Sequence, residues 1–230
     1  MQAIILAAGN DLQLGNKQTP RCLLKIGRKP LINHLADQLP KEITEVVLVV
    51  GQQKKKIKEQ VGQSLNNRPV KYVTQKEQLG TGHALWTARS AITSERFMVL
   101  MSDNLYHRQD MAQCLKYKNT LLAKKMEMPE RYGVVNTSDQ RLISVSERAR
   151  DCVSTLINCG LYVLTSEIFN YPLVDIGSQT DGHREYGLPQ QITLLAETES
   201  VHIEWARFWI PISTIQEFKA TNKYLKKIYQ

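Results

Sequence analysis

A short apolar run near the N-terminus constrains the fold of this chain most strongly. Residues Ala3–Ala8 are apolar without a break, and the run stops at Gly9. Such a run is typical of a buried parallel strand that passes into a loop at its carboxyl end, where open α/β sheets bind ligands. We therefore predict a ligand site at Leu6, Ala7, Ala8 and Gly9, because small residues let a bound anion approach the backbone. The alternative is an ordinary strand-to-loop turn without a ligand.

Three more strands are predicted in the first half of the chain. They are Glu45–Gly51, Val70–Thr74 and Phe97–Met101, and segments with helical patterns separate them. The alternation predicts an α/β fold with a Rossmann-like doubly wound sheet up to about Cys114. Between the first run and the first helix, the polar residues Asn10–Thr19 are predicted to form a loop.

The alternation of predicted strands and helices ends in the second half of the chain. Shorter strands with little helix between them are predicted at residues 121–125, 132–136, 142–145 and 158–164. A helix is predicted at 186–196, two strands at 201–204 and 208–212, and a final helix from about Thr214. This pattern adds mixed or antiparallel strands, so the complete sheet is predicted to be mixed.

Composition and charge narrow the class of protein. The chain has 230 residues, of which 42% are hydrophobic, and it contains no apolar run long enough to cross a bilayer. Cytoplasmic residence without a membrane partner is the default expectation. The net charge of +8 suits a polyanionic partner such as a nucleotide. The lysine clusters Lys54–Lys58 and Lys223–Lys227 are more simply explained as solvated helix faces, so no nucleic-acid partner is expected.

The cysteines do not form a metal-binding pattern. Cys22, Cys114, Cys152 and Cys159 are scattered, no CxxC pair occurs, and no histidine stands at ligand spacing from them. Reduced and mostly buried thiols are therefore predicted, without a zinc site.

The segment Gln75–Leu85 is the most informative polar stretch. Its Gly80-Thr81-Gly82 turn opens a helix that is predicted to continue through Ala91. Free N–H groups and a hydroxyl at a helix N-terminus suit an anion or the edge of a base. The alternative is that Thr81 is an ordinary N-cap.

A carboxylate also follows the strand at Phe97–Met101. Asp103 stands at the expected carboxyl end of that strand. In this position a carboxylate can hold Mg²⁺ against phosphates, and the alternative is a turn or capping residue. The position alone leaves both interpretations open.

Taken in order, these motifs resemble the sugar-nucleotide nucleotidyltransferases, also called NDP-sugar pyrophosphorylases. Gln75–Leu85 is most similar to the uridylyltransferase domain of N-acetylglucosamine-1-phosphate uridylyltransferase. The resemblance implies one nucleotidyltransferase domain over residues 1–230, with a nucleotide half at about 1–114 and a sugar-phosphate half at about 115–230. It also implies that a sugar-1-phosphate attacks the α-phosphorus of a nucleoside triphosphate, with UTP or dTTP favoured, and that pyrophosphate leaves. Mg²⁺ is the implied cofactor, and a homodimer is the family-level expectation.

The resemblance also implies roles for individual residues. The loop at Leu6, Ala7, Ala8 and Gly9 wraps the phosphates, and Gln75, Gly80 and Thr81 recognise the base. Arg21 and Asp103 are the implied catalytic residues, and Asp103 is the implied metal ligand. Gly133, Glu147 and Asn158 are implied to contact the sugar phosphate.

Several positions depart from the family pattern. Asp11 and Gln13 replace the second glycine and the arginine of the phosphate loop, and Pro211 stands where a second metal ligand is usual. These departures motivate one alternative, a catalytically weak or inactive paralogue that binds a nucleotide sugar as a regulatory subunit. The pattern Pro20-Arg21-Cys22-Leu23 motivates a second, a CTP-dependent cytidylyltransferase for a phosphorylated alcohol such as phosphocholine.

Overall fold

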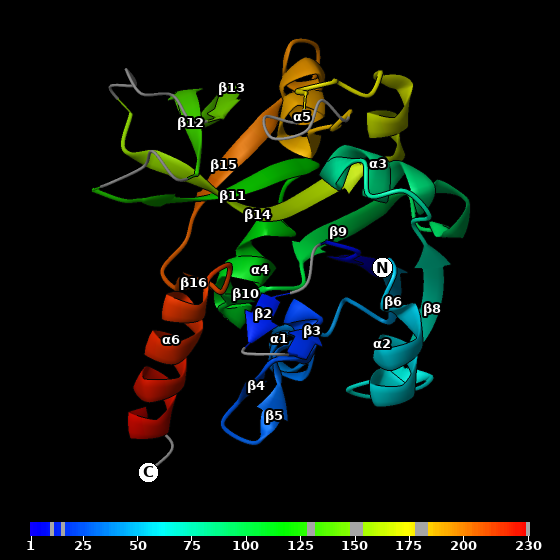
Figure 1. The fold of residues 1–230 in the computed structure, drawn as a ribbon. Coiled ribbons are helices and arrows are strands. Elements are labelled where there is room, and N and C mark those ends of the chain that lie inside the picture. The colour runs from blue at the N-terminus through cyan, green and yellow to red at the C-terminus, as the bar shows by residue number, and fades with distance from the viewer. Residues whose placement is uncertain (10–11, 15–16, 128–131, 148–153, 178–183, 229–230) are drawn as a thin grey trace.

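The computed structural model describes residues 1–9, 12–14, 17–127, 132–147, 154–177 and 184–228 (Figure 1). Four parallel strands form the centre of the sheet: β1 (Gln2–Ala7), β6 (Glu45–Val50), β8 (Arg68–Thr74) and β9 (Arg96–Met101). β1 is the inner strand, with β6 on one side and β9 on the other. Its carboxyl end therefore lies at the centre of the sheet edge, as the sequence predicted.

Helices cover both faces of this central sheet. On one face Ile4 and Leu6 pack with α3 (Gly80–Thr87) and α5 (Leu188–Ala196). On the other face Ala3 and Ile5 pack with α1 (Leu31–Gln38), α2 (Lys54–Val61) and α4 (Arg108–Cys114). In Figure 1 the first pair of helices lies above the sheet and the other three lie below it. Burial on both faces explains why β1 is a continuous apolar run, and the doubly wound fold is confirmed.

The second half of the chain extends the same sheet. Its strands are β11 (Asn119–Lys125), β12 (Gly133–Ser138), β13 (Arg141–Glu147), β14 (Leu156–Thr165) and β15 (Val201–Trp205). β14 runs antiparallel to β9 and joins the two halves, so the predicted mixed sheet is confirmed. β11 pairs with both β14 and β15, and a single bridge joins β13 to β15. These five strands thereby close into a ring, which the sequence did not predict.

The remaining elements are short. They are β2 (Leu12–Leu14), β3 (Lys17–Thr19), a 3₁₀ turn (Arg21–Leu23), β4 (Lys25–Ile26), β5 (Lys29–Pro30), β7 (Ser64–Leu65), β10 (Asn104–Tyr106), β16 (Trp209–Pro211) and α6 (Ile215–Ile228). Two further 3₁₀ turns lie at Arg89–Ala91 and Ser166–Asn170. β10 and β16 form a separate antiparallel pair, which places residues 209–211 beside the end of β9.

Two predictions about local structure are wrong. The segment Asn10–Thr19 contains an antiparallel β2–β3 pair in place of an open loop, because its backbone groups find partners within the segment. The helix predicted to reach Ala91 ends at Thr87 and is followed by a 3₁₀ turn, in which Ala91 N–H donates to the carbonyl of Ala88 at 2.8 Å.

The structure describes three of the four cysteines. Cys22, Cys114 and Cys159 are buried thiols that form no disulfide with one another, whereas Cys152 lies outside the described residues. Burial raises the pKa of the Cys114 and Cys159 thiols. Within the ranges given above, no helix is long and apolar enough to span a membrane.

Candidate active site

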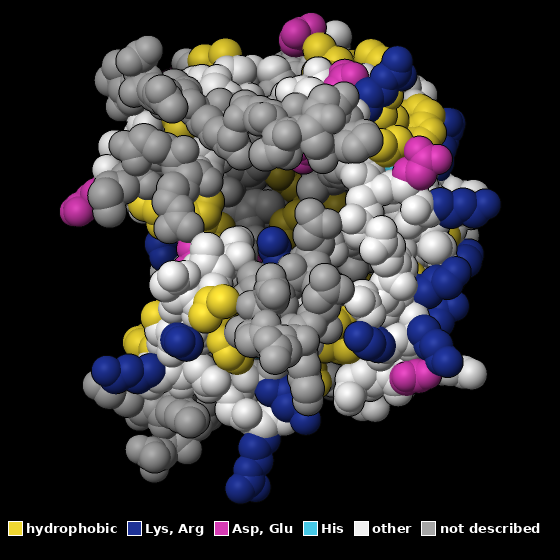
Figure 2. Space-filling view, viewed as in Figure 1, with side chains coloured by type: hydrophobic (Ala, Val, Ile, Leu, Met, Phe, Trp, Pro, Cys, Tyr) yellow, Lys and Arg dark blue, Asp and Glu magenta, His cyan; other side chains and the backbone are white. Residues whose placement is uncertain are grey.

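A cleft of about 530 Å³ opens at the carboxyl ends of β1, β6 and β9. Figure 2 shows the same face hollowed near its centre, with apolar and basic side chains inside. The cleft is lined by every residue that the sequence assigned to nucleotide binding or catalysis, namely Leu6, Ala7, Ala8, Gly9, Arg21, Gln75, Gly80, Thr81 and Asp103. These residues come from segments far apart in the sequence, and the sheet edge brings them together.

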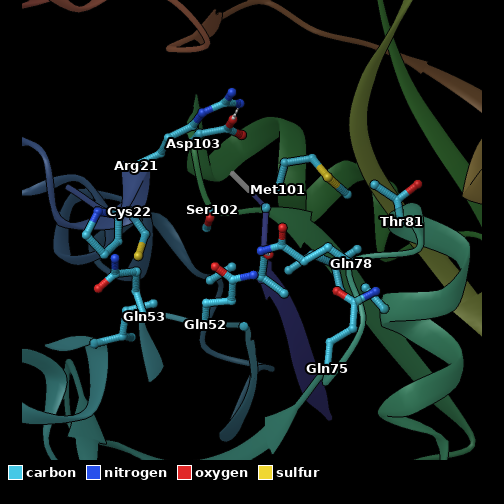
Figure 3. Close-up of a pocket in the computed structure, with 18 of the residues that line it drawn as sticks. Arg21, Cys22, Gln52, Gln53, Gln75, Gln78, Thr81, Met101, Ser102 and Asp103 are labelled. Carbon is cyan, nitrogen blue, oxygen red and sulfur yellow. Dashed lines mark hydrogen bonds and ion pairs between the residues drawn. The ribbon is translucent and has the colours of Figure 1, made fainter. Parts of the chain in front are cut away.

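Arg21 and Asp103 form the charged end of the cleft. Arg21 lies in the 3₁₀ turn after Pro20, and Asp103 follows the end of β9. The Nη1 of Arg21 donates to the Oδ2 of Asp103 at 3.0 Å (Figure 3). The two side chains keep 31% and 19% of their surface exposed, so the pair can still meet a ligand. The Nε of Arg21 is buried and has no hydrogen-bond partner among the described residues.

The residues around Asp103 fit a magnesium ion that is held by one carboxylate of the protein. Asn104 pairs with Pro211 across β10 and β16, and the N–H of Ile212 donates to the carbonyl of Asp103 at 2.9 Å. Pro211 therefore lies beside this turn but offers no side-chain oxygen. Mg²⁺ usually takes one or two carboxylates and completes its shell with waters and substrate phosphates. A single carboxylate is enough for this way of binding Mg²⁺. Among the described residues, no three or more His, Cys, Asp or Glu side chains lie close enough together to form a preformed metal site.

The amide end of the cleft consists of Gln75, Gln78 and Thr81 (Figure 3) together with Gly80. Gln75 follows β8 and is only 4% exposed. Its Nε2 donates to the carbonyl of Gly80 at 3.1 Å and lies 3.0 Å from the Nδ1 of His83. The Nε2 of Gln78 donates to the carbonyl of Ala8 at 2.7 Å. These hydrogen bonds connect Gln75 to residues of α3 and connect Gln78 to the residue after β1.

The backbone of the amide end packs against the segment before α5. Gly80 has φ +87°, and a Cβ there would lie 2.6 Å from the carbonyl oxygen of Tyr186, so only glycine fits. The hydroxyl of Thr81 accepts from the N–H of Leu188 at 3.1 Å. The N-cap of α3 is Leu79, so the alternative that Thr81 caps its own helix is wrong. Thr81 instead satisfies a free N–H at the start of α5.

The residues assigned to the sugar phosphate lie together outside the lining of this cleft. Gly133 on β12 pairs with Glu147 on β13. Val134 pairs with Ile157 on β14, which places Gly133 next to Asn158 in the antiparallel register. The three residues thus occupy neighbouring positions on three adjacent strands, although 14 residues separate the first two along the chain and 11 separate the last two.

A buried hydrogen-bond network connects the charged end to Asn158. The side-chain amide of Asn104 donates to the carbonyl of Cys159 at 3.2 Å, and the hydroxyl of Tyr106 donates to the same carbonyl at 3.0 Å. Burial raises the pKa of the Tyr106 phenol well above its usual range, so it remains a donor. Asn158 accepts from the N–H of Gly160 at 2.9 Å. The strand that carries Asn158 is therefore fixed relative to the residue after Asp103.

Several residues of the cleft were not identified from the sequence. They include Gln78 at the amide end, Gln52 and Gln53 after β6, and Glu185 on the segment before α5. His83, which contacts the Gln75 amide without lining the cleft, was not identified either. The glycine that ends the second apolar run, Gly51, gave the same signal as Gly9 and could have indicated Gln52 and Gln53. No sequence signal indicated Glu185, because only the packing of residues 184–187 on Gly80 brings it to the cleft.

Comparisons with known proteins agree with this geometry. The family model described as nucleotidyl transferase matches residues 2–227. A bifunctional protein GlmU from Methanococcus maripaludis is 30% identical over 235 residues, which cover 99% of this chain and 55% of that protein. The chain therefore spans about half the length of this relative. The UTP–glucose-1-phosphate uridylyltransferase AglF of Haloferax volcanii is 31% identical over 212 residues, which cover 85% of this chain and 83% of AglF.

A solved structure shows the same fold at lower identity. The inositol-1-phosphate CTP transferase from T. maritima aligns with a TM-score of 0.80 at 18% identity, over 100% of this chain and 96% of that one. At this identity the likeness establishes the fold alone. Since proteins named for UTP and for CTP both align over most of the chain, the fold does not select the nucleotide.

Proposed function

Because this chain belongs to the nucleotidyl transferase family, we propose that it transfers a nucleotidyl group from UTP or dTTP to a sugar-1-phosphate and releases pyrophosphate. The observation that carries the proposal is the cleft, in which all the residues assigned to the nucleotide and to catalysis meet. The similarity to a protein named UTP–glucose-1-phosphate uridylyltransferase supports the choice of substrates.

The charged end supplies the electrostatic part of the reaction. A phosphate oxygen of the sugar-1-phosphate forms a bond to the α-phosphorus, the bond from that phosphorus to the bridging oxygen breaks, and pyrophosphate leaves with the electron pair. Such a transfer needs alignment and charge neutralisation more than a protein nucleophile. Arg21 can turn its guanidinium donors to phosphate oxygens, which match its planar geometry. Asp103 would hold Mg²⁺, which when bound neutralises charge on the phosphates.

The other parts of the site position the two substrates. Gln75, Gly80 and Thr81 present polar groups to the base at the amide end. Gln75 follows β8, and three strands lie between β8 and β14 of the ring in the second half. Gly133, Glu147 and Asn158 would receive the sugar phosphate, and the buried bonds of Asn104 and Tyr106 keep that strand in register with Asp103. Positioning of this kind can supply a large part of the rate enhancement.

A regulatory paralogue remains the first alternative. Pro211 favours this alternative, because it lies beside the Asp103 turn and has no side-chain oxygen that could bind a metal ion. Asp11 and the side chain of Gln13 lie outside the described residues, so these two departures from the family pattern support the alternative by sequence alone. The second alternative, a cytidylyltransferase for a phosphorylated alcohol, is favoured by the structural likeness to a protein named as a CTP transferase.

One assay separates the three functions. The protein is incubated with Mg²⁺, each nucleoside triphosphate in turn, and a panel of sugar-1-phosphates together with phosphocholine, and pyrophosphate release is measured. Release with UTP or dTTP and a sugar-1-phosphate is the expected result. Release only with CTP and phosphocholine would favour the cytidylyltransferase. No release with any pair, together with saturable binding of a nucleotide sugar, would favour the regulatory paralogue.

A further inference from the structure

The orientation of the Gln75 side chain at the amide end is fixed by its partners. The carbonyl of Gly80, 3.1 Å away, can only accept a hydrogen bond. The amide nitrogen of Gln75 must therefore face Gly80, because the opposite orientation would bring two acceptors together. The same nitrogen lies 3.0 Å from the Nδ1 of His83, and this contact is a hydrogen bond when Nδ1 accepts.

This arrangement uses both N–H groups of the Gln75 amide. A primary amide has two N–H donors and one carbonyl oxygen with two lone pairs. Gly80 takes one donor and His83 takes the other. No donor among the described residues pairs with the Oε1 of Gln75, although the residue is only 4% exposed and lines the cleft. The side chain therefore offers a ligand a single kind of group, a hydrogen-bond acceptor.

An acceptor held in this way discriminates between pyrimidines. Uracil and thymine carry a proton on N3, whereas N3 of cytosine is itself an acceptor. When N3 faces Oε1, uracil and thymine form a hydrogen bond and cytosine leaves two acceptors opposed, which is costly in a buried site.

We propose that His83 is a positioning residue for base selection, which holds Gln75 so that only its carbonyl oxygen faces the base and UTP or dTTP is preferred over CTP. The proposal rests on the proposed nucleotide site and adds the origin of its selectivity. His83 lies on α3 one turn after Gly80, so the helix fixes both partners of the Gln75 amide relative to each other. Of the two acceptors that hold the amide, only the carbonyl of Gly80 would remain without His83 to oppose a flipped amide, in which the Nε2 donors of Gln75 face N3 of cytosine.

The test uses two substitutions of His83, one that removes the hydrogen-bond acceptor and one that keeps an acceptor near the same place. His83→Ala removes the acceptor, whereas His83→Asn places an amide oxygen at about the position of Nδ1, since both atoms are bonded to Cγ. Dissociation constants for UTP and CTP are measured by calorimetry on the whole chain, and kcat/KM is measured for both nucleotides. His107→Ala is the matched histidine control, because His107 caps α4 and is not among the residues that line the cleft.

The expected result is a change in selectivity that the asparagine variant rescues. His83→Ala should lower the preference for UTP over CTP by about three- to tenfold, the usual range for one neutral hydrogen bond. His83→Asn and His107→Ala should stay within about twofold of the wild type. An unchanged preference in His83→Ala, with an unchanged unfolding temperature, would overturn the role of His83. Equal loss in the alanine and asparagine variants would also overturn it, because ring packing would then be the cause.

The two proposals can fail separately. If the wild type prefers UTP in binding and His83→Ala loses that preference, the role of His83 stands even when no pyrophosphate is released, and only the proposed reaction is rejected. If pyrophosphate is released but the preference does not depend on His83, only the positioning role is rejected. A wild type that binds neither nucleotide overturns both.

Discussion

The two ends of the cleft are built differently. At the amide end, Gln75, Gly80 and His83 lie within nine residues of sequence and hold one another through direct hydrogen bonds. At the charged end, Arg21 and Asp103 are 82 residues apart and are joined by one partly exposed ion pair. The amide end is thus ordered by its own contacts, whereas the charged end has unused donors that a ligand can engage. Substitutions at the charged end should therefore change turnover, and backbone substitutions at the amide end should change stability.

Removal of the Asp103 charge should have the largest effect. Asp103→Asn keeps the shape of the side chain but removes the charge that would hold Mg²⁺. Pyrophosphate release should fall by about 10²- to 10³-fold, the usual cost of losing one electrostatic contact to a transition state. The ion pair is partly exposed, so its loss should cost less than about 1 kcal/mol of stability.

The matched control for this change is Asp37→Asn, because Asp37 also forms an ion pair, with Lys29, but is not among the residues that line the cleft. Pyrophosphate release by this variant should match the wild type. Full activity of Asp103→Asn would show that Asp103 is only a turn residue, and the distinction between the two ends would lose its basis.

A backbone substitution at the amide end should have the largest effect on stability. Gly80→Ala places a Cβ 2.6 Å from the carbonyl oxygen of Tyr186 at a positive φ, so the loop or the segment before α5 must move. The free energy of unfolding should fall by about 2–4 kcal/mol. Gly62→Ala is the control, since Gly62 also has a positive φ, of +70°, but its Cβ would meet no atom within 4 Å.

The control should lose less, about 1–3 kcal/mol, the cost of its glycine-type backbone conformation (φ +70°, ψ −147°) alone. Denaturant unfolding measures both variants. Equal losses would show that the contact with Tyr186 adds nothing, and the amide end would then be no more rigid than an ordinary turn.

Truncation of Arg21 should have an intermediate effect, confined to the rate. Arg21→Ala removes the donors proposed to meet the phosphates, and kcat should fall by about 10- to 100-fold while KM for the sugar-1-phosphate changes less. Arg21→Lys restores a positive charge without the planar geometry and should recover part of the rate. Steady-state kinetics distinguishes the variants. An unchanged kcat in Arg21→Ala would assign the neutralisation to another basic residue.

The sequence predicted local structure at both ends of the cleft better than it predicted contacts between distant segments. Periodicity and turn residues identify strands, helices and their ends, and they correctly predicted that a helix opens at the Gly80-Thr81-Gly82 turn and that Asp103 follows a strand. The pairing of Arg21 with Asp103 depends on how two distant segments meet, which no local pattern contains. The closure of β11 and β15 into the ring and the position of Pro211 beside Asn104 depend on tertiary contacts in the same way.

The role of His83 was missed for a different reason. His83 lies inside a stretch whose other residues were assigned roles, but hydrogen-bond direction decides its function, and direction is visible only when Gly80 and His83 are both placed around the Gln75 amide. For Glu147 in the second half, the structure describes the strand position but not the side chain, so its contact with the sugar phosphate stays a prediction.

Restoration of a carboxylate beside Asp103 should give the smallest effect. Pro211→Asp adds an oxygen ligand on β16 opposite Asn104, and it also releases a backbone constraint at the end of a short strand. Binding of Mn²⁺, used as a paramagnetic substitute for Mg²⁺ and measured by electron paramagnetic resonance, should tighten by about three- to tenfold, a gain typical of one added ligand contact. Pro211→Asn tests the same oxygen without the charge and should give a smaller gain. Unchanged Mn²⁺ binding in both variants would show that residue 211 does not reach the metal position, and the charged end would then depend on Asp103 and the bound phosphates alone.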